Sequence, residues 1–234
     1  EIVASSSITP SSGGFAISWW QKTTQADNTY AYTMDNGGGS LGNGLYIITH
    51  NTSVGLIIGF KNGSVFQQSI PYSSEERTEW THFCFSWDGD STTNAFKIYK
   101  NNIATSFTSP ITNTSAAYPF RIGRSYNGTD YFGGLIDQVR IFSSDLSQAA
   151  VTALYNETPT TATYNYLDYE QGNSVAYYKM ENATDQLGNY NGTATDVDFN
   201  TEGKFGFAGD FNGLQTSSAS YIDISSSSTS TVCS

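Results

Sequence analysis

Short segments in which apolar and polar residues alternate recur along the first two thirds of the chain, with glycine- and asparagine-rich turns between them. Alternation with a period of two is the pattern of a β-strand that buries one face. The clearest segments are FAISWW, GLYIITH, VGLIIGF, HFCFSWD, AFKIYKNN, FRIGR and GGLIDQVRIF, which begin at residues 15, 44, 54, 82, 95, 120 and 133. Many short strands of this kind predict an all-β protein, a two-sheet antiparallel sandwich or jelly roll.

One helical pattern follows these strands, in residues 147–157, SQAAVTALYNE. Ser147 is suited to cap the helix N-terminus, and the apolar residues after it recur on one face. The polar segment 158–174 has no periodic pattern and is predicted to be a linker. A second β pattern then begins at residue 175. We therefore expect one short helix between two stretches of strands.

The two ends of the chain are similar to each other. Residues 221–227, YIDISSS, match residues 1–7, EIVASSS, at an offset of 220 positions (221 − 1). Similarity at a fixed offset is typical of tandem arrays. We interpret the sequence as a window cut from such an array, in which the two end segments compete for one position in a sheet.

Several blocks resemble the laminin-G-like, concanavalin-A-like lectin/glucanase family. They are WTHFCFSWDG, FKIYKNN, FRIGR, YFGGLIDQVRIFSSDLSQAAVTALYNE and VAYYKMENATDQLGNYNGTATDVDFNTEGKFGFAGDFNG. In that family the last block comes first, so its order is rotated here. Residues 175–234 resemble the family's N-terminal strands, and residues 1–157 resemble the rest. The asparagine-, serine- and threonine-rich style is also similar to virion modules of marine bacteriophages.

The resemblance implies a two-sheet jelly roll that residues 175–234 must complete. A half-sandwich of about 60 residues buries too little surface to fold alone. The C-terminal strands either fold back onto residues 1–157 of their own chain or insert into a neighbouring copy by strand exchange. A separate module, completed by residues outside this sequence, is the less favoured third arrangement.

The amino-acid composition limits the kinds of molecule that this protein is expected to bind. Tyr, Phe and Gly are abundant (16, 14 and 22 residues), only 13% of residues are charged, and the net charge is −11. An acidic surface excludes nucleic acid and anionic membrane as favoured partners. Two cysteines, Cys84 and Cys233, are too few for a disulfide framework and are predicted to be free thiols. We find no signal peptide and no apolar run of membrane length, as expected of a mature fragment or a protein released by lysis.

Four residues are candidate ligands for a structural Ca²⁺ ion. Alternation along GGLIDQVRIF turns Asp137 into the sandwich, where a carboxylate needs a partner. The loop ENATDQLGNYNG supplies Glu181, Asp185 and Asn189, hard oxygen donors of the kind that Ca²⁺ prefers. The family resemblance also implies a cation between these two segments. The alternative for Asp137 is a set of hydrogen bonds from loop amides.

Catalytic residues are harder to find. Related glucanases carry three carboxylates at alternate positions of one strand. The nearest match is YLDYE, where Asp168 and Glu170 alternate but Tyr166 replaces the first carboxylate. His82 and Cys84 share a strand face, which is also ordinary packing. We therefore predict that the protein is not an enzyme.

Glycan contact is predicted at two aromatic turn segments. RSYNGTDYFGG contains Tyr126, Asn127 and Asp130, and DNTYAYTMDNGGG contains Tyr30 and Asp35. Aromatic rings stack on sugar faces, while amide and carboxylate groups hydrogen-bond to hydroxyls. The alternative is that these aromatic residues cover the edge of the core.

The sequence favours a non-catalytic, lectin-like module on a virion surface or in another extracellular setting, acting in structure, decoration or adhesion. Expected partners are other copies, sibling virion proteins joined by strand exchange, and a surface glycan. One alternative is a secreted bacterial carbohydrate-binding module attached to a polysaccharide-active enzyme. The other, less favoured, is a glucanase-like glycoside hydrolase, since fold alone does not settle function.

Overall fold

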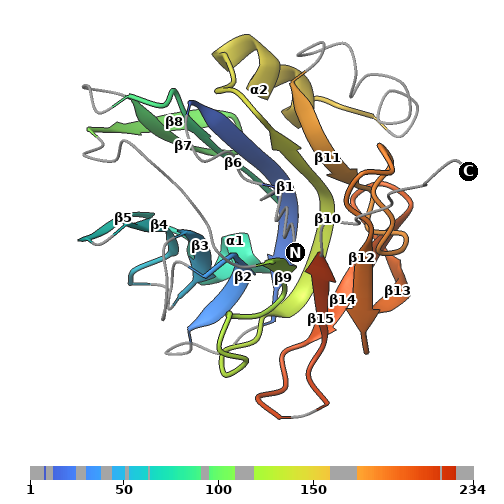
Figure 1. The fold of residues 1–234 in the computed structure, drawn as a ribbon. Coiled ribbons are helices and arrows are strands. Elements are labelled where there is room, and N and C mark those ends of the chain that lie inside the picture. Colours follow the sequence, from blue (N-terminus) through green and yellow to red (C-terminus); the bar gives the residue numbers. More distant parts are fainter. Residues whose placement is uncertain are drawn as a thin grey trace, which may run out of the picture.

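A computed structural model describes residues 8, 13–24, 30–37, 44–50, 53–62, 64–90, 95–108, 119–158, 173–216 and 218–224. These residues form two antiparallel sheets that pack face to face, with the longer of the two helices at the edge of the molecule (Figure 1). The prediction of an all-β, two-sheet sandwich is confirmed. No helix in these ranges is both long and apolar enough to cross a membrane.

The eight-stranded sheet contains, in spatial order, β13 (Asp198–Glu202), β14 (Phe207–Asn212), β10 (Gly133–Phe142), β1 (Phe15–Thr23), β6 (Thr81–Trp87), β7 (Phe96–Lys100) and β8 (Ile103–Phe107), with β11 (Ser174–Tyr178) also paired to β10. The seven-stranded sheet contains β12 (Gly192–Thr195), β15 (Tyr221–Ile224), β9 (Phe120–Ile122), β2 (Ala31–Asp35), β3 (Gly44–Thr49), β4 (Leu56–Asn62) and β5 (Ser64–Ile70). Strand neighbours that are distant in sequence, such as β1 and β10, are what a jelly roll requires.

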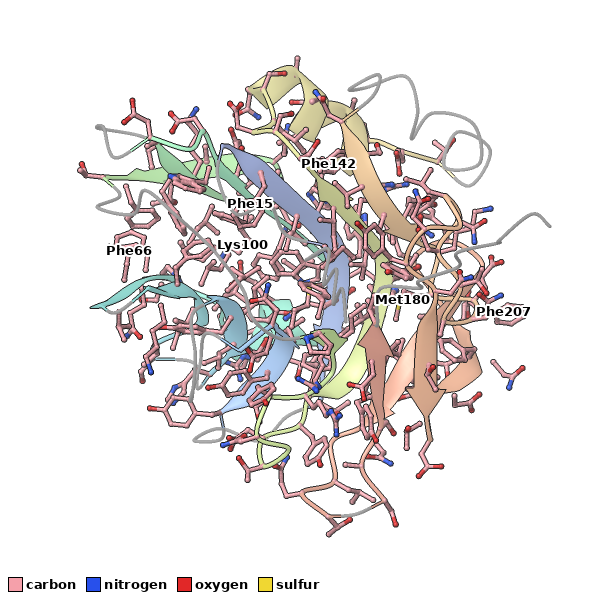
Figure 2. All side chains as sticks on the ribbon, in the orientation of Figure 1. Phe15, Phe66, Lys100, Phe142, Met180 and Phe207 are labelled. Atoms are coloured by element: carbon pink, nitrogen blue, oxygen red, sulfur yellow. The ribbon has the colours of Figure 1, made fainter. Side chains whose placement is uncertain are left out.

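The core lies between the two sheets and is strongly aromatic (Figure 2). The Phe15 ring meets the Phe85 ring edge-on at 5.0 Å and the Phe60 ring at 5.7 Å between centroids. Edge-to-face contacts of this kind are the favourable geometry for buried aromatic pairs. Phe15, Trp87 and Phe96 point into this core, but β6 is buried at every position, because the region of α2 covers the other face of the sheet.

The predicted helix is α2 (Gln148–Tyr155), which covers the outer face of the eight-stranded sheet. Ser147 caps it by accepting a hydrogen bond from the Ala150 N–H at 3.2 Å. A second helix, α1 (Ser74–Arg77), was not predicted. It is one turn long and forms because Ser73 and Glu76 make a capping box, a signal too short to show a period.

The C-terminal strands lie in the same two sheets as the rest of this chain. β11 and β14 both pair with β10, and β15 pairs with β9 (Figure 1, orange and red). Strand exchange between copies would use the same pairs and stays a prediction. Residues 1–7 and 225–227, residues 159–172 of the expected linker and Cys233 lie outside the described residues. Cys84 is buried as a free thiol.

Candidate functional site

Asp137 lies in the middle of β10 with no exposed surface. The prediction that it shares the inner face of Val139 and Ile141 is wrong: it pairs with Trp20, outside the core between the sheets, because the positive φ of 52° at Gln138 interrupts the alternation. Its Oδ2 accepts the Phe205 N–H at 3.0 Å, and its Oδ1 accepts from the Gln138 side chain at 3.1 Å. Burial raises the pKa of Asp137 to about 7, although hydrogen bonds from Phe205 and Gln138 partly oppose this rise. Hydrogen bonds from amide groups are the alternative to a Ca²⁺ ligand that the sequence left open for Asp137.

The tight turn of residues 203–206, between β13 and β14, lies against two of the candidate ligands. A Cβ at Gly203 would come within 2.8 Å of Asp137 Oδ2, and one at Gly206 within 2.5 Å of Glu181 Oε1. Gly206 also has a positive φ of 66°. Both positions of the turn therefore need glycine. The carboxylates of Asp137 and Glu181 both lie against this one turn.

Asp185 organises its own loop. Its Oδ1 accepts the N–H groups of Tyr177 and Leu187 at 2.8 and 3.1 Å, and its Oδ2 accepts those of Asn189 and Tyr190 at 3.0 and 3.1 Å. Four N–H donors occupy the lone pairs that a cation would use. The geometry of Asp185 does not fit a metal ligand, and Asn189 contributes a main-chain donor to the same arrangement.

The calcium prediction now depends on Asp137 and Glu181. Within the described ranges, no group of three or more His, Cys, Asp or Glu side chains is placed to hold a metal. Asp137 also accepts a hydrogen bond on each oxygen, from Gln138 and from Phe205, so Ca²⁺ would share these oxygens with them while it compensates the burial of the charge. We therefore keep calcium as a proposal for these two carboxylates and their turn.

Stability is expected to fall as the pH rises through the titration of Asp137. The folded pKa of about 7 lies above the unfolded value of 3.8, so the folded state binds the proton more tightly. The contribution is therefore full below about pH 4 and is lost between about pH 4 and 7. Between pH 5 and 8, wild type should lose about 2 kcal/mol relative to Asp137→Asn, measured by urea unfolding in EGTA. Calcium should restore wild type only, and parallel pH curves for the two proteins would contradict the assignment.

The two predicted glycan segments meet at Asp35. This carboxylate is fully buried at the end of β2, where Oδ1 accepts the Gly37 N–H at 2.8 Å and Oδ2 accepts the Tyr126 N–H at 2.7 Å. Asp35 therefore fixes the loop that carries Tyr126. Its role is to position that loop, because it has no surface to offer a sugar.

Asn127 and Asp130 shape the same loop. The Ser125 hydroxyl donates to Asn127 Oδ1 at 2.5 Å, and the Asp130 N–H donates to Ser125 Oγ at 3.2 Å. The Thr129 hydroxyl lies 2.8 Å from Asn127 Oδ1 and 2.8 Å from Asp130 Oδ2. Tyr30 is 55% exposed, and its ring packs edge-on against His50.

Sequence reasoning missed four residues that complete the site beside Tyr126. Arg121 Nε donates to Asp223 Oδ1 at 2.9 Å, and Arg124 Nη2 donates to Asp223 Oδ2 at 2.9 Å. The Arg121 guanidinium lies 4.9 Å from the centre of the Tyr126 ring, and that of Arg124 lies 3.5 Å from the Tyr221 ring. We call these five residues the arginine–tyrosine platform.

The platform lies on the outer face of the seven-stranded sheet. Asp223 of β15 pairs with Arg121 of β9, which pairs in turn with Asp35 of β2. Arg121 Nη1 and Arg124 Nε are buried and have no hydrogen-bond partner in the described part of the chain. The sequence contained one signal that could have identified these residues, which was alternation. Arg121 and Asp223 each lie between two core residues of a short strand.

The histidine and cysteine of β6 are not arranged for nucleophilic catalysis. His82 Nε2 lies 2.9 Å from Ser18 Oγ, but His82 Nδ1 meets no orienting group among the described residues. Burial, with Arg140 and Lys204 nearby, lowers the pKa of His82 to about 3, and burial raises the pKa of the Cys84 thiol. Both side chains are neutral near pH 7. Asp168 and Glu170 lie outside the described residues.

A laminin G-type family model, described as the concanavalin A-like lectin/glucanases superfamily, matches residues 2–152. Adhesion G-protein coupled receptor V1 of Danio rerio is 23% identical over 187 residues, which cover 74% of this chain but only 3% of the receptor. Among solved structures, domain 4 of AbnA, a GH43 extracellular arabinanase from Geobacillus stearothermophilus in complex with arabinotriose, is 22% identical, with 64% of this chain and 69% of that chain covered and a TM-score of 0.48. The binding domain of botulinum neurotoxin DC in complex with SialylT is 13% identical, with 65% and 36% covered and a TM-score of 0.49. With TM-scores below 0.5, these similarities carry no information about the site.

Proposed function

We propose that this chain, which belongs to the concanavalin A-like lectin/glucanase superfamily, is a non-catalytic module that binds an uncharged surface glycan. The observation that carries the proposal is the arginine–tyrosine platform. Tyr126 and Tyr221 are half-buried rings held in place by stacked guanidinium groups, and Asp223 fixes both guanidinium groups. Binding sites work best when such side chains are fixed before the ligand arrives.

The charge balance of the platform favours a neutral ligand. Arg121 and Arg124 are balanced by Asp223 and by Asp35, which lies behind the Tyr126 loop. The chain as a whole carries a net charge of −11, which repels acidic polymers. A neutral sugar can stack on a tyrosine ring while its hydroxyl groups accept from guanidinium N–H groups.

Absence of catalysis is part of the proposal. The neutral His82 and the protonated Cys84 support it, because neither provides a base or a thiolate near pH 7. A carbohydrate-binding module of a polysaccharide-active enzyme would use the same platform and differs only in its attachment. Turnover of β-glucans by the purified chain would instead support the glucanase alternative.

The proposed setting is extracellular or on a virion surface, where the module would act in decoration or adhesion. The similarity to a receptor named for adhesion supports a surface role. The virion setting is supported only by the tandem, asparagine- and serine-rich style of the sequence.

Tyr126→Ala should weaken binding to the glycan that a neutral and acidic polysaccharide array identifies. We expect about a tenfold loss, equivalent to about 1.4 kcal/mol, by titration calorimetry. Phe207→Ala is the matched control, because Phe207 is an exposed aromatic residue on β14 of the other sheet, and it should bind like wild type. Binding of a neutral glycan should not depend on salt. Equal affinity of Tyr126→Ala and wild type, or a preference for acidic glycans, would overturn the proposal.

A further inference from the structure

Two terminal strands, one from each sheet, lie on the same flank of the sandwich. β5 ends the seven-stranded sheet and β8 ends the eight-stranded sheet. The Phe66 ring of β5 and the Phe107 ring of β8 both pack on Phe96, at 5.2 and 6.0 Å between centroids. Phe66 marks this flank in Figure 2, and we call it the open flank.

The opposite flank is protected against pairing with another chain. Its edge strand β12 has only four residues. Its other edge strand, β13, carries Asp198 and Glu202, and its pairing with β14 is interrupted by a register shift between Asp198 and Thr201. Short edges, charged residues and bulges are the devices by which proteins prevent edge-to-edge association.

On the open flank, β5 has none of these devices. β5, with the sequence SVFQQSI, and β8, with the sequence IATSF, contain no charged residue and no proline. β5 pairs with β4 over all seven residues without a register shift, and no further strand pairs with it in the described ranges. Val65 on β5 and Ile103 on β8 are 60% and 74% exposed. A regular, uncharged strand of this length is a template for another strand.

We propose that a second copy of this chain docks on the open flank through antiparallel pairing of β5 with the partner's β5. Antiparallel pairing of one strand with itself is two-fold symmetric, the commonest symmetry of protein dimers. Centred on Gln67, it sets Val65 opposite the partner's Ser69. The nearest charge on β4 is Lys61, which stands one strand behind the edge, opposite Val65. Because the chain is otherwise strongly acidic, this uncharged edge is where two copies approach with least repulsion.

The test is the light-scattering mass of the chain from about 10 µM to about 1 mM, the range of weak association. Wild type should pass from the mass of one chain to that of two. Val65→Lys/Ser69→Lys should remain a single chain, because pairing would bring lysines of the two copies face to face. Both positions are exposed, so thermal unfolding should show an intact fold, with only a small loss from the new charge opposite Lys61. Thr193→Lys/Ala194→Lys, on exposed positions of β12, adds the same charge and should dimerise like wild type.

Three results would overturn the proposal: a wild type that stays a single chain at about 1 mM, a mass that grows beyond two chains, and a Val65→Lys/Ser69→Lys variant that dimerises like wild type. The last result would point to strand exchange through residues 175–224, which lysines on β5 do not affect. Glycan binding can be measured on each variant separately, since the platform lies on β9, the loop that follows it and β15, and not on β5 or β12.

Discussion

Glu157→Ala should destabilise the fold by about 3–5 kcal/mol, the cost of leaving a buried charge without its partner. Arg140 Nη2 lies 2.8 Å from Glu157 Oε2, and the two side chains are 2% and 0% exposed. Arg140 cannot give up its proton, so the substitution leaves an uncompensated cation under the end of α2. The free energy of unfolding in urea measures the loss.

The ion pair also joins parts of the chain that are distant in sequence. Arg140 of β10 donates to Gln138 at 3.3 Å and lies 4.3 Å from the centre of the Tyr177 ring on β11. Glu157 follows α2, where the chain leaves the first stretch of strands. Loss of the pair should therefore loosen the joint between β10, α2 and β11.

A double variant separates the pair from its surroundings. Arg140→Met/Glu157→Leu removes both charges and keeps most of the volume, so it should be about 3 kcal/mol more stable than Glu157→Ala. A Glu157→Ala protein within about 1 kcal/mol of wild type would show that water reaches Arg140 and that the pair behaves as a surface salt bridge.

The fold could be predicted from sequence because its signals are local. Alternation in segments such as FAISWW and HFCFSWD depends only on neighbouring residues, and both became central strands, β1 and β6. α1 escaped prediction because a single turn shows no period. The rotated order of the family blocks stays a prediction, and the strands with which residues 175–224 pair could not be read from the sequence.

The site was only partly predictable because its contacts join distant residues. Asp35 and Tyr126 were both predicted from the sequence. The hydrogen bond from the Tyr126 N–H to Asp35, however, joins residues that are 91 positions apart. Arg121 and Asp223 are 102 residues apart, and neither belongs to a recognisable motif. Their pairing depends on the register of β9 against β15, which the sequence pattern does not specify.

Asp185 shows why a metal ligand and a loop anchor are hard to tell apart in sequence. Ca²⁺ and a cluster of main-chain N–H groups both require an acidic side chain among glycines and asparagines. In the structure, Asp185 Oδ1 and Oδ2 each accept two N–H groups. The direction of those four N–H groups decides between the two interpretations, and it follows from the folded loop.

Asp185→Ala should accordingly destabilise the protein by about 3–5 kcal/mol, because the buried N–H of Tyr177 and three part-buried N–H groups lose their acceptor, at about 1–3 kcal/mol for a donor that water does not reach. The N–H of Tyr177 lies within β11, so the loss should reach the pairing of β11 with β10. Urea unfolding gives the free energy, and hydrogen exchange at Tyr177 and Tyr190 shows where protection is lost. The loss should be equal in calcium and in EGTA.

Asp198→Ala is the matched control. Asp198 also accepts a main-chain N–H two residues ahead, that of Asn200 at 2.8 Å, but it is exposed on an edge strand where water replaces the bond. It should cost less than about 0.5 kcal/mol. If calcium stabilised wild type but not Asp185→Ala, the carboxylate would be a metal ligand after all, and its four N–H bonds would have to rearrange on binding.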